Sequence, residues 1–161
     1  GDGRMTGDTW ANRIRVSAKA LIISDGKLLV IRHEDSGGVY HTLPGGGQRP
    51  FETQTAALVR ECQEELGATV RVGALRFVRE YIGRHHEFAH KDGETHQVEC
   101  IFDCQLVGDY IPALGDTPDA TQTGVVWIPL SALAEHRLYP AALRKPLQSA
   151  ALGAVYIGDV N

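Results

Sequence analysis

The feature that most constrains this chain is residues 53–66, where apolar side chains recur at helical spacing. With about 100° of rotation per residue they fall on one stripe of a helix, formed by Ala56, Leu58, Val59, Cys62 and Leu66. Gly67 follows, at the position where a left-handed residue commonly ends a helix. Upstream, residues 44–47 read Pro-Gly-Gly-Gly and are expected to break regular structure. The pattern predicts an amphipathic helix that follows a glycine-rich loop and packs its stripe on a core.

Strand-like segments lie on both sides of this helix. The predicted strands are a β-hairpin within residues 14–34, a short strand at 39–43, longer strands at 69–81 and 96–106, and a strand at 125–128. In residues 96–106 apolar and polar side chains alternate, and Glu99 falls on the mostly polar face. Glu99 is therefore expected either to face a ligand or to face solvent.

The remaining segments predict loops and short helices. Residues 83–95 form a polar loop and residues 108–124 a long irregular surface loop. A short helix is expected at residues 131–135, and a further one starting at Pro140 that Pro146 would end or kink. The order of elements predicts one domain over residues 13–161, an α/β sandwich with a mixed β-sheet, after a loose tail at residues 1–12.

Length and composition narrow the classes of protein. A chain of 161 residues fits one domain with a self-sufficient core. Lys and Arg number 16 against 20 Asp and Glu, so the net charge of −4 argues against a general nucleic-acid surface. A polyanionic ligand would then need local arginines or a metal. Three cysteines make no disulfide framework, which favours a cytoplasmic protein, and no apolar run reaches the roughly 20 residues that span a bilayer.

Three glutamates share the helix arc opposite the apolar stripe. Glu61, Glu64 and Glu65 lie three or four residues apart or side by side, which brings side chains to about 5 to 6 Å between Cβ atoms. Like charges at that spacing destabilise a helix unless a cation lies among them. Such a carboxylate cluster suits Mg²⁺ or Mn²⁺, which prefer oxygen ligands and also accept phosphate oxygens. The alternative is a solvated, glutamate-rich helix face.

Residues 46–68, GGQRPFETQTAALVRECQEELGA, resemble the Nudix box, G-x5-E-x7-R-E-U-x-E-E-x-G-U, where U is a bulky aliphatic residue. All the fixed letters match, at Gly46, Glu52, Arg60, Glu61, Glu64, Glu65 and Gly67. Cys62 and Ala68 fill the two U positions, and Arg49 and Phe51 stand where many members have Glu and Gly. The Pro-Gly-Gly-Gly-Gln run at residues 44–48 and residues 156–161 are similar to a bacterial subgroup of the family.

The resemblance implies an α/β/α sandwich that binds Mg²⁺, with Mn²⁺ as an alternative. Glu61 and Glu65 would be the main metal ligands, with Glu64 and the carbonyl of Gly45 as further ligands. Glu52 and Arg60 would pair to fix the loop against the helix, as groups behind metal ligands do. The implied reaction is hydrolysis of the diphosphate linkage of a nucleoside diphosphate joined to another group. The substrate would be a small nucleotide, and a homodimer is common in the family.

Residues outside the box supply candidates for proton transfer and substrate binding. The general base is left open among Glu61, Glu94, Glu99 and Asp119, because a carboxylate free of metal is preferable for proton transfer. The substrate-binding candidates are Arg32, Tyr81, Arg84, Phe88 and Glu99, with Tyr40, Arg79, Lys91 and Trp127 as further phosphate-binding or stacking candidates. Each of these could instead be a surface ion-pair partner or a core aromatic. The loop at residues 83–95 is the leading candidate for specificity.

Two alternative readings remain. A zinc site from His86-x3-His90 and Cys100-x3-Cys104 is disfavoured, because four residues of strand separate the two cysteines by about 13 Å. A domain with this box could also bind a nucleotide without cleaving it. The intact glutamates favour the enzyme over such a non-catalytic sensor module.

Overall fold

The computed structural model describes residues 13–149 and 153–161. The strands are β1 (Ile14–Ser24), β2 (Lys27–Asp35), β3 (Gly38–Thr42), β4 (Gly45–Gly47), β5 (Val70–Ile82), β6 (His96–Leu106), β7 (Gln122–Pro129), β8 (Leu138–Tyr139) and β9 (Tyr156–Asp159). The α-helices are α2 (Gln54–Leu66), α3 (Ala89–Asp92) and α4 (Arg144–Gln148), with short 3-10 helices η1 (Gly83–His85), η2 (Leu130–Glu135) and η3 (Ala141–Leu143).

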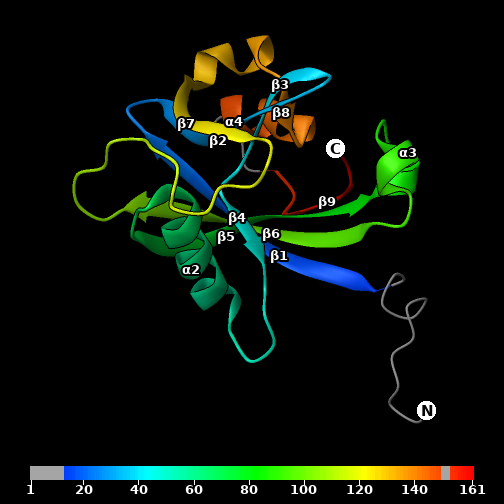
Figure 1. Ribbon diagram of the computed structural model, residues 1–161, viewed down its shortest axis with the longest axis horizontal. Coiled ribbons are helices and arrows are strands. Elements are labelled where there is room, and N and C mark those ends of the chain that lie inside the picture. The colour runs from blue at the N-terminus through cyan, green and yellow to red at the C-terminus, as the bar shows by residue number, and fades with distance from the viewer. Residues whose placement is uncertain (1–12, 150–152) are drawn as a thin grey trace.

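The strands form one strongly curled, mixed sheet (Figure 1). Its order is β8-β3-β2-β1-β6-β5-β9, with β4 also paired to β1 and β7 to β2. The pairs β1/β6, β3/β8 and β5/β9 are parallel and the others antiparallel. Strands β1 and β2 pair with each other only next to their turn, where Ile23 pairs with Leu28 and Ser24 with Lys27. Beyond these residues the two strands diverge into the two halves of the sheet. The expected sandwich with a mixed sheet is confirmed.

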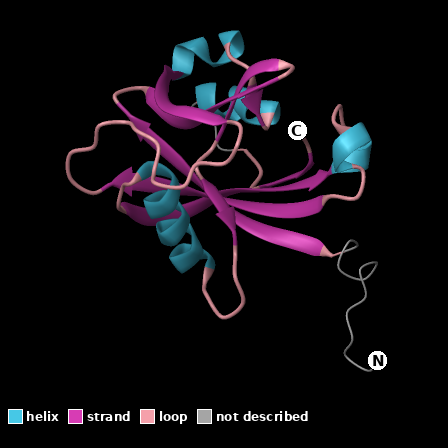
Figure 2. Ribbon diagram, in the orientation of Figure 1, coloured by secondary structure: helices cyan, strands magenta, loops and turns pink. Residues whose placement is uncertain are grey.

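Two hydrophobic clusters hold these layers together. In the first, the α2 stripe with Leu58, Cys62 and Leu66 packs on Ala18 and Ile22 of β1. The second cluster lies under the helical turns of the C-terminal third, which Figure 2 shows on the other side of the sheet; it includes Leu21, Val30, Ile128, Leu133, Leu143 and Leu147. Successive β1 residues alternate between the two clusters because strand side chains point to opposite faces. Strand β1 is therefore the shared wall of both.

Helix α2 confirms the prediction for residues 53–66. The hydroxyl of Thr53 caps it by accepting a hydrogen bond from the Ala56 N–H at 3.1 Å. Gly67 ends it with φ of 64°, and its N–H donates to the Gln63 carbonyl at 3.0 Å. This left-handed conformation suits glycine because it lacks the Cβ that would crowd the backbone.

Three predictions need correction. The glycine run is not irregular: Gly45–Gly47 forms β4, which pairs with Ser17, Ala18 and Lys19 of β1. Gly45 has φ of 135°, and a Cβ there would lie 2.1 Å from the Ala18 carbonyl oxygen, so glycine is what allows this approach.

Glu99, on the polar face of β6, does not face solvent, because it is only 5% exposed. The helix after Pro140 starts as η3 and continues as α4 through Pro146. Pro146 is tolerated because it lies in the first turn of α4, where backbone N–H groups need no helical partner.

Candidate functional site

A cavity of about 550 Å³ opens where β4 meets α2, and we call it the acidic cavity. All three glutamates of the α2 arc line it, together with the backbone of β4. Its other walls come from β1, β2 and β7 and from the segment before β7, and include Arg15, Ser17, Lys19, His33, Asp119 and Gln122. The residues that the helical spacing put on one arc therefore face one hollow.

Arg60 connects the helix to the glycine strand and the loop after it. Its guanidinium donates to both carboxylate oxygens of Glu52, at 2.7 and 3.2 Å, and to the Gly47 carbonyl at 3.0 Å. The same group contacts Glu61 at 3.0 Å and Glu64 at 3.5 Å. The hydrogen bonds from Arg60 lower the pKa of Glu52 to about 2, so this carboxylate stays ionised at neutral pH. The predicted pairing of Glu52 with Arg60 is present.

Glu65 reaches back to the start of β4. One carboxylate oxygen accepts from the Gly45 N–H at 2.7 Å, and the other accepts from the Gln122 side chain at 2.9 Å. The Lys19 ammonium donates to the Gly45 carbonyl at 3.4 Å. Burial raises the pKa of Glu65, against the opposing effects of Lys19 and these two donors. The Gly45 carbonyl and the Glu65 carboxylate thus lie together beside a cation.

Gly46 lets Glu61 lie directly on the backbone of β4. A Cβ on Gly46 would be 2.6 Å from the Glu61 carboxyl carbon and 2.7 Å from both of its oxygens. No side chain at position 46 would fit between the β4 backbone and the Glu61 carboxylate where it lies. The glycine therefore sets how closely Glu61 approaches the strand.

The donor set suits a hard divalent cation. The three α2 carboxylates and the Gly45 carbonyl, all oxygen donors, line the acidic cavity, and Lys19 and Arg60 bring positive charge to them. Within residues 13–149 and 153–161, no three His, Cys, Asp or Glu side chains are gathered closely enough to hold an ion as they stand. The glutamates instead contact Arg60, the Gly45 N–H and Gln122. The glutamates suit a divalent ion because they are oxygen donors and because all three face the acidic cavity.

Sequence reasoning missed several residues of this cavity. Lys19 and His33 lie on strands that read as hairpin core, and Gln122 follows a loop with no recognisable pattern. His33 is buried, with its ring nitrogens 2.9 Å from the Thr121 hydroxyl and 2.7 Å from the Thr42 hydroxyl. Burial, and then Lys19, lowers the pKa of His33, so it is neutral at pH 7. For Lys19 and His33, the signal that could have indicated a site was a charged or titratable residue within or directly after an apolar stretch of strand.

A second cavity of about 380 Å³ adjoins the first and shares Arg15, Thr42 and Gln97 with it. We call it the tyrosine pocket, because its walls carry the rings of Tyr40, Tyr81, Phe88 and Tyr139. The guanidinium of Arg137 lies over the rings of Tyr40, Phe88 and Tyr139, with its central carbon 5.4 to 5.9 Å from their centroids. Aromatic faces and nearby cations can hold a flat, anionic ligand such as a nucleotide.

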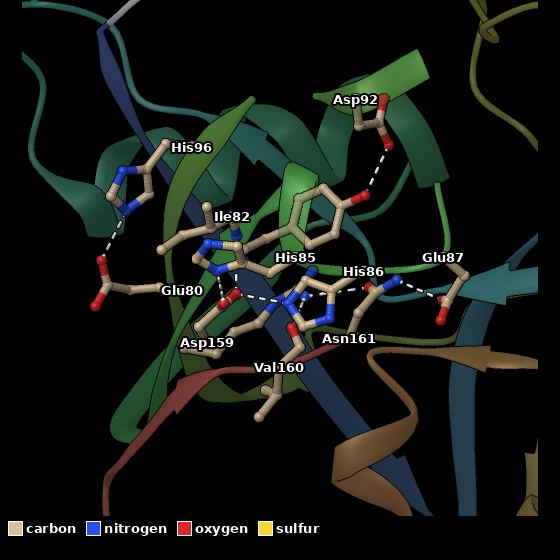
Figure 3. A network of polar contacts seen from close by, with 12 residues as sticks. Glu80, Ile82, His85, His86, Glu87, Asp92, His96, Asp159, Val160 and Asn161 are labelled. Atoms are coloured by element: carbon tan, nitrogen blue, oxygen red, sulfur yellow. Dashed lines mark hydrogen bonds and ion pairs between the residues drawn. The ribbon is translucent and has the colours of Figure 1, made fainter. Parts of the chain in front are cut away.

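The C-terminal segment contributes Asn161 to the wall of the tyrosine pocket. Figure 3 shows the polar contacts that hold this segment. Asp159 accepts from the Ile82 N–H at 2.9 Å and lies 2.8 Å from His85 and 2.6 Å from His86. The His86 ring stacks on Tyr81, a residue of the pocket wall. Asn161, which also lines the pocket, donates to Glu87 at 2.8 Å. Segments far apart in the chain thus build one wall.

Arg79 is the buried link behind this wall. It is 7% exposed, donates to Glu99 at 2.6 Å and also donates to the Val160 carbonyl at 2.6 Å. Burial alone would raise the pKa of Glu99, but Lys19 and Arg79 outweigh it and hold the pKa below its usual value. A buried carboxylate held ionised by a buried arginine keeps its partner in place.

The predicted substrate-binding residues divide by position. Tyr81 and Phe88 line the tyrosine pocket. Arg32 contacts Thr123 and Glu34, and Arg84 contacts Glu94 and the Gly93 carbonyl; neither of them lines the acidic cavity or the tyrosine pocket. Glu99 is buried behind Arg79 and also lines neither cavity. Of the candidates for the general base, Glu61 and Asp119 line the acidic cavity, whereas Glu94 lies outside it.

Comparison with known protein families identifies the family of this chain. The NUDIX domain matches residues 13–149, which include every residue of the acidic cavity. The chain belongs to the NUDIX family. The prediction of a Nudix pyrophosphohydrolase is confirmed at the level of the family, and a Nudix hydrolase acts on small nucleotide substrates with the help of a divalent metal.

Solved structures share the Nudix fold. A NUDIX hydrolase from Nitrosomonas europaea is 20% identical with a TM-score of 0.65, over 84% of this chain and 88% of that one. A MutT NUDIX hydrolase from Burkholderia pseudomallei is 22% identical with a TM-score of 0.65, over 86% and 99%. An ADP-ribose pyrophosphatase from Streptococcus suis is 19% identical with a TM-score of 0.56, over 89% and 99%. A search of curated proteins found no match. Within the described residues, no helix is long and apolar enough to span a bilayer.

Proposed function

We propose that this Nudix protein hydrolyses the diphosphate linkage of a nucleoside diphosphate joined to another group. The observation that carries the proposal is that Glu61, Glu64 and Glu65 face one cavity beside the glycine strand. We further propose that the Pro-Gly-Gly-Gly-Gln run at residues 44–48 marks a bacterial subgroup, and that a cytoplasmic location suits its free cysteines.

In this proposal Glu61, Glu65 and the Gly45 carbonyl hold Mg²⁺ or Mn²⁺, with Glu64 as a further ligand. A bound divalent ion neutralises phosphate oxygens and lowers the pKa of a water molecule. Arg60 and Glu52 position Glu61 through the contacts described above, and Gly46 sets its approach to the backbone. Lys19, beside Gly45, supplies a further positive charge for the phosphates.

The proton of the attacking water needs an acceptor that no metal occupies. We assign that role to Asp119, because it lines the acidic cavity outside the glutamate arc. Glu99 is a poor base in its buried pair with Arg79, since its pKa is lowered. Glu94 lies with Arg84 outside the cavity.

A phosphate-release screen tests the proposal. Nucleotide sugars, dinucleoside polyphosphates and modified nucleoside triphosphates are incubated with the protein, with and without Mg²⁺ or Mn²⁺. Turnover that requires the ion and is abolished by Glu65→Gln supports catalysis. The matched control is Glu135→Gln, an exposed glutamate on η2 that lines neither cavity. Tight nucleotide binding without turnover of any compound would instead establish a non-catalytic sensor module.

A further inference from the structure

Three hollows meet at one arginine. Arg15, on the exposed start of β1, lines the acidic cavity, the tyrosine pocket and a third hollow of about 580 Å³. Among the described residues, Arg15 has no hydrogen-bond or ion-pair partner. Its guanidinium is therefore available to a ligand that passes from one hollow to the next.

The third hollow, which we call the Phe51 hollow, adjoins the acidic cavity. The two share Arg15, Val16 and Gly47. Its walls are apolar at Ile14, Val16, Pro50 and Phe51 and cationic at Arg13, Arg15 and Arg49. Gln48 and Glu52 also line it, but the Gln48 amide donates to the Glu52 carbonyl and the Glu52 carboxylate is paired with Arg60. In a chain of net charge −4, this grouping of arginines beside a proposed phosphate site is a local exception. Its charge and its apolar surface match a phosphate chain that ends in a flat, weakly polar group.

The exposure and the backbone conformation of Phe51 also point to a ligand in this hollow. Its side chain is fully exposed, and its backbone has φ of 70°, a conformation that residues with a side chain rarely adopt. A ring that is exposed in this way contributes nothing to either hydrophobic cluster. The fold would accept glycine there with less strain, so the needs of folding do not account for the phenylalanine.

We propose that the substrate is a dinucleoside polyphosphate, which has a base at each end. One base lies in the tyrosine pocket, the phosphate chain passes Arg15 in the acidic cavity, and the second base stacks on Phe51. This inference rests on the proposed function and narrows its substrate class. Water adds across one P–O–P bond, so each product keeps one nucleoside and the phosphates on its side of that bond.

The chemistry of the Phe51 hollow distinguishes this substrate from a nucleotide sugar. A sugar presents hydroxyl groups that need several polar partners, whereas the hollow offers mainly apolar side chains and guanidinium groups. A base offers a flat π-face, which stacks on a phenyl ring and on the plane of a guanidinium. The volumes of about 380 and 580 Å³ are each of the size that holds a small-molecule group.

The test compares kcat and KM for two adenosines joined by four phosphates, for ADP-ribose and for ATP. We expect the dinucleoside compound to have the highest kcat/KM. Phe51→Gly should raise its KM by about tenfold more than it raises the KM for ADP-ribose, because the loss of one base-stacking ring has an effect of this order. The same substitution should leave the melting temperature equal or higher, since glycine adopts φ of 70° without strain.

Ile111→Gly is the matched control, because Ile111 is also an exposed apolar residue in a loop but lines none of the three hollows. It should leave both KM values unchanged. Arg15→Gln should lower kcat/KM for the dinucleoside compound by about tenfold, through the lost phosphate contact.

The possible failures are distinguishable. If no compound is hydrolysed, the proposed function itself fails. If ADP-ribose is the better substrate and Phe51→Gly acts equally on both compounds, the hydrolase stands and the dinucleoside assignment is overturned. If light scattering shows that Phe51→Gly turns a dimer into a monomer, the hollow is an interface between two copies, and the assignment is likewise overturned.

Discussion

The acidic cavity and the tyrosine pocket lie side by side but are assembled in different ways. The three glutamates and the glycine backbone of the acidic cavity come from one stretch of chain, residues 45–65, in which β4 leads into α2. The tyrosine pocket takes its walls from β1, β3, β5, β6, α3, β8 and the C-terminal segment. The proposed metal ligands are thus placed by local spacing, whereas the walls of the tyrosine pocket are placed by the register of distant strands. Four groups of substitutions test this contrast, and they are given in order of decreasing expected effect.

The largest effect is expected at the helix. Glu61→Gln keeps the size of the side chain but removes the negative charge that faces the acidic cavity, so kcat should fall by about 10³-fold. The measurement is steady-state turnover at saturating Mg²⁺, with Glu135→Gln assayed in parallel. A variant that kept more than a tenth of wild-type turnover would remove Glu61 from the proposed metal site.

Arg60→Gln should have the next largest effect. It removes the contacts to Glu52, Glu61, Glu64 and the Gly47 carbonyl while leaving every glutamate in place. Loss of a group that orients metal ligands commonly costs about 10- to 100-fold in activity or metal affinity, and we expect kcat/KM to fall within that range. Glu52→Gln should show a smaller loss, and the double variant should be less impaired than the two losses multiplied. Independent, multiplicative losses would contradict the positioning role.

Two glycines of the same segment should separate activity from stability. Gly46→Ala places a methyl group against the flexible Glu61 carboxylate, so activity should fall by about tenfold with little change in stability. Gly67→Ala meets no neighbouring atom but forces alanine into φ of 64°, so the free energy of unfolding should fall by about 1 kcal/mol with activity intact. Urea denaturation and turnover assays of both variants measure this. Equal effects on both properties would contradict the separation.

The smallest effect is expected at the tyrosine pocket. Asp159→Asn weakens the contacts to His85 and His86 that hold the C-terminal wall, so KM should rise by about threefold with kcat unchanged. Burial alone would raise the pKa of Asp159, but hydrogen bonds from His86, the Ile82 N–H and His85 lower it from 3.8 to about 2.

The sign of the pH dependence follows from this lowered pKa. The stabilisation from Asp159 is fully present above its ordinary pKa of 3.8 and is lost as the pH falls through about 2. The difference in free energy of unfolding between the wild type and Asp159→Asn should therefore shrink as the pH falls from about 4 through about 2. Urea denaturation at several pH values measures this difference. If this difference in free energy of unfolding instead grew as the pH fell below about 4, the Asp159 carboxylate would not stabilise the C-terminal wall of the tyrosine pocket.

Individual residues show where sequence reasoning reached its limit. The arc of Glu61, Glu64 and Glu65 follows from helical rotation alone, and the pairing of Glu52 with Arg60 follows from the family resemblance; both are found in the structure. Glu99 could not be placed in this way. Strand alternation assigned it to a polar face, but only pairing of β6 with β5 shows that Arg79 buries it.

Lys19 and His33 were missed for a related reason. Lys19 lies between two alanines of β1, and His33 lies among the polar residues that end β2. Alternation by itself does not say whether the face that carries either side chain meets solvent or a cavity. The curl of the sheet decides that, because it brings β1, β2 and the glycine strand around one hollow.

The helix, its caps and the chemistry of its outward face could be read from the sequence, because they depend on contacts within a few residues. The fold class followed from the order of the predicted elements and from the family resemblance. Three other features became visible only in the fold: the glycine run pairs as a strand, Arg79 lies behind the tyrosine pocket, and Arg15 lines three hollows. Those features depend on strand register and sheet curvature, which bring together residues from Arg15 to Asn161 whose separation along the chain carries no local signal.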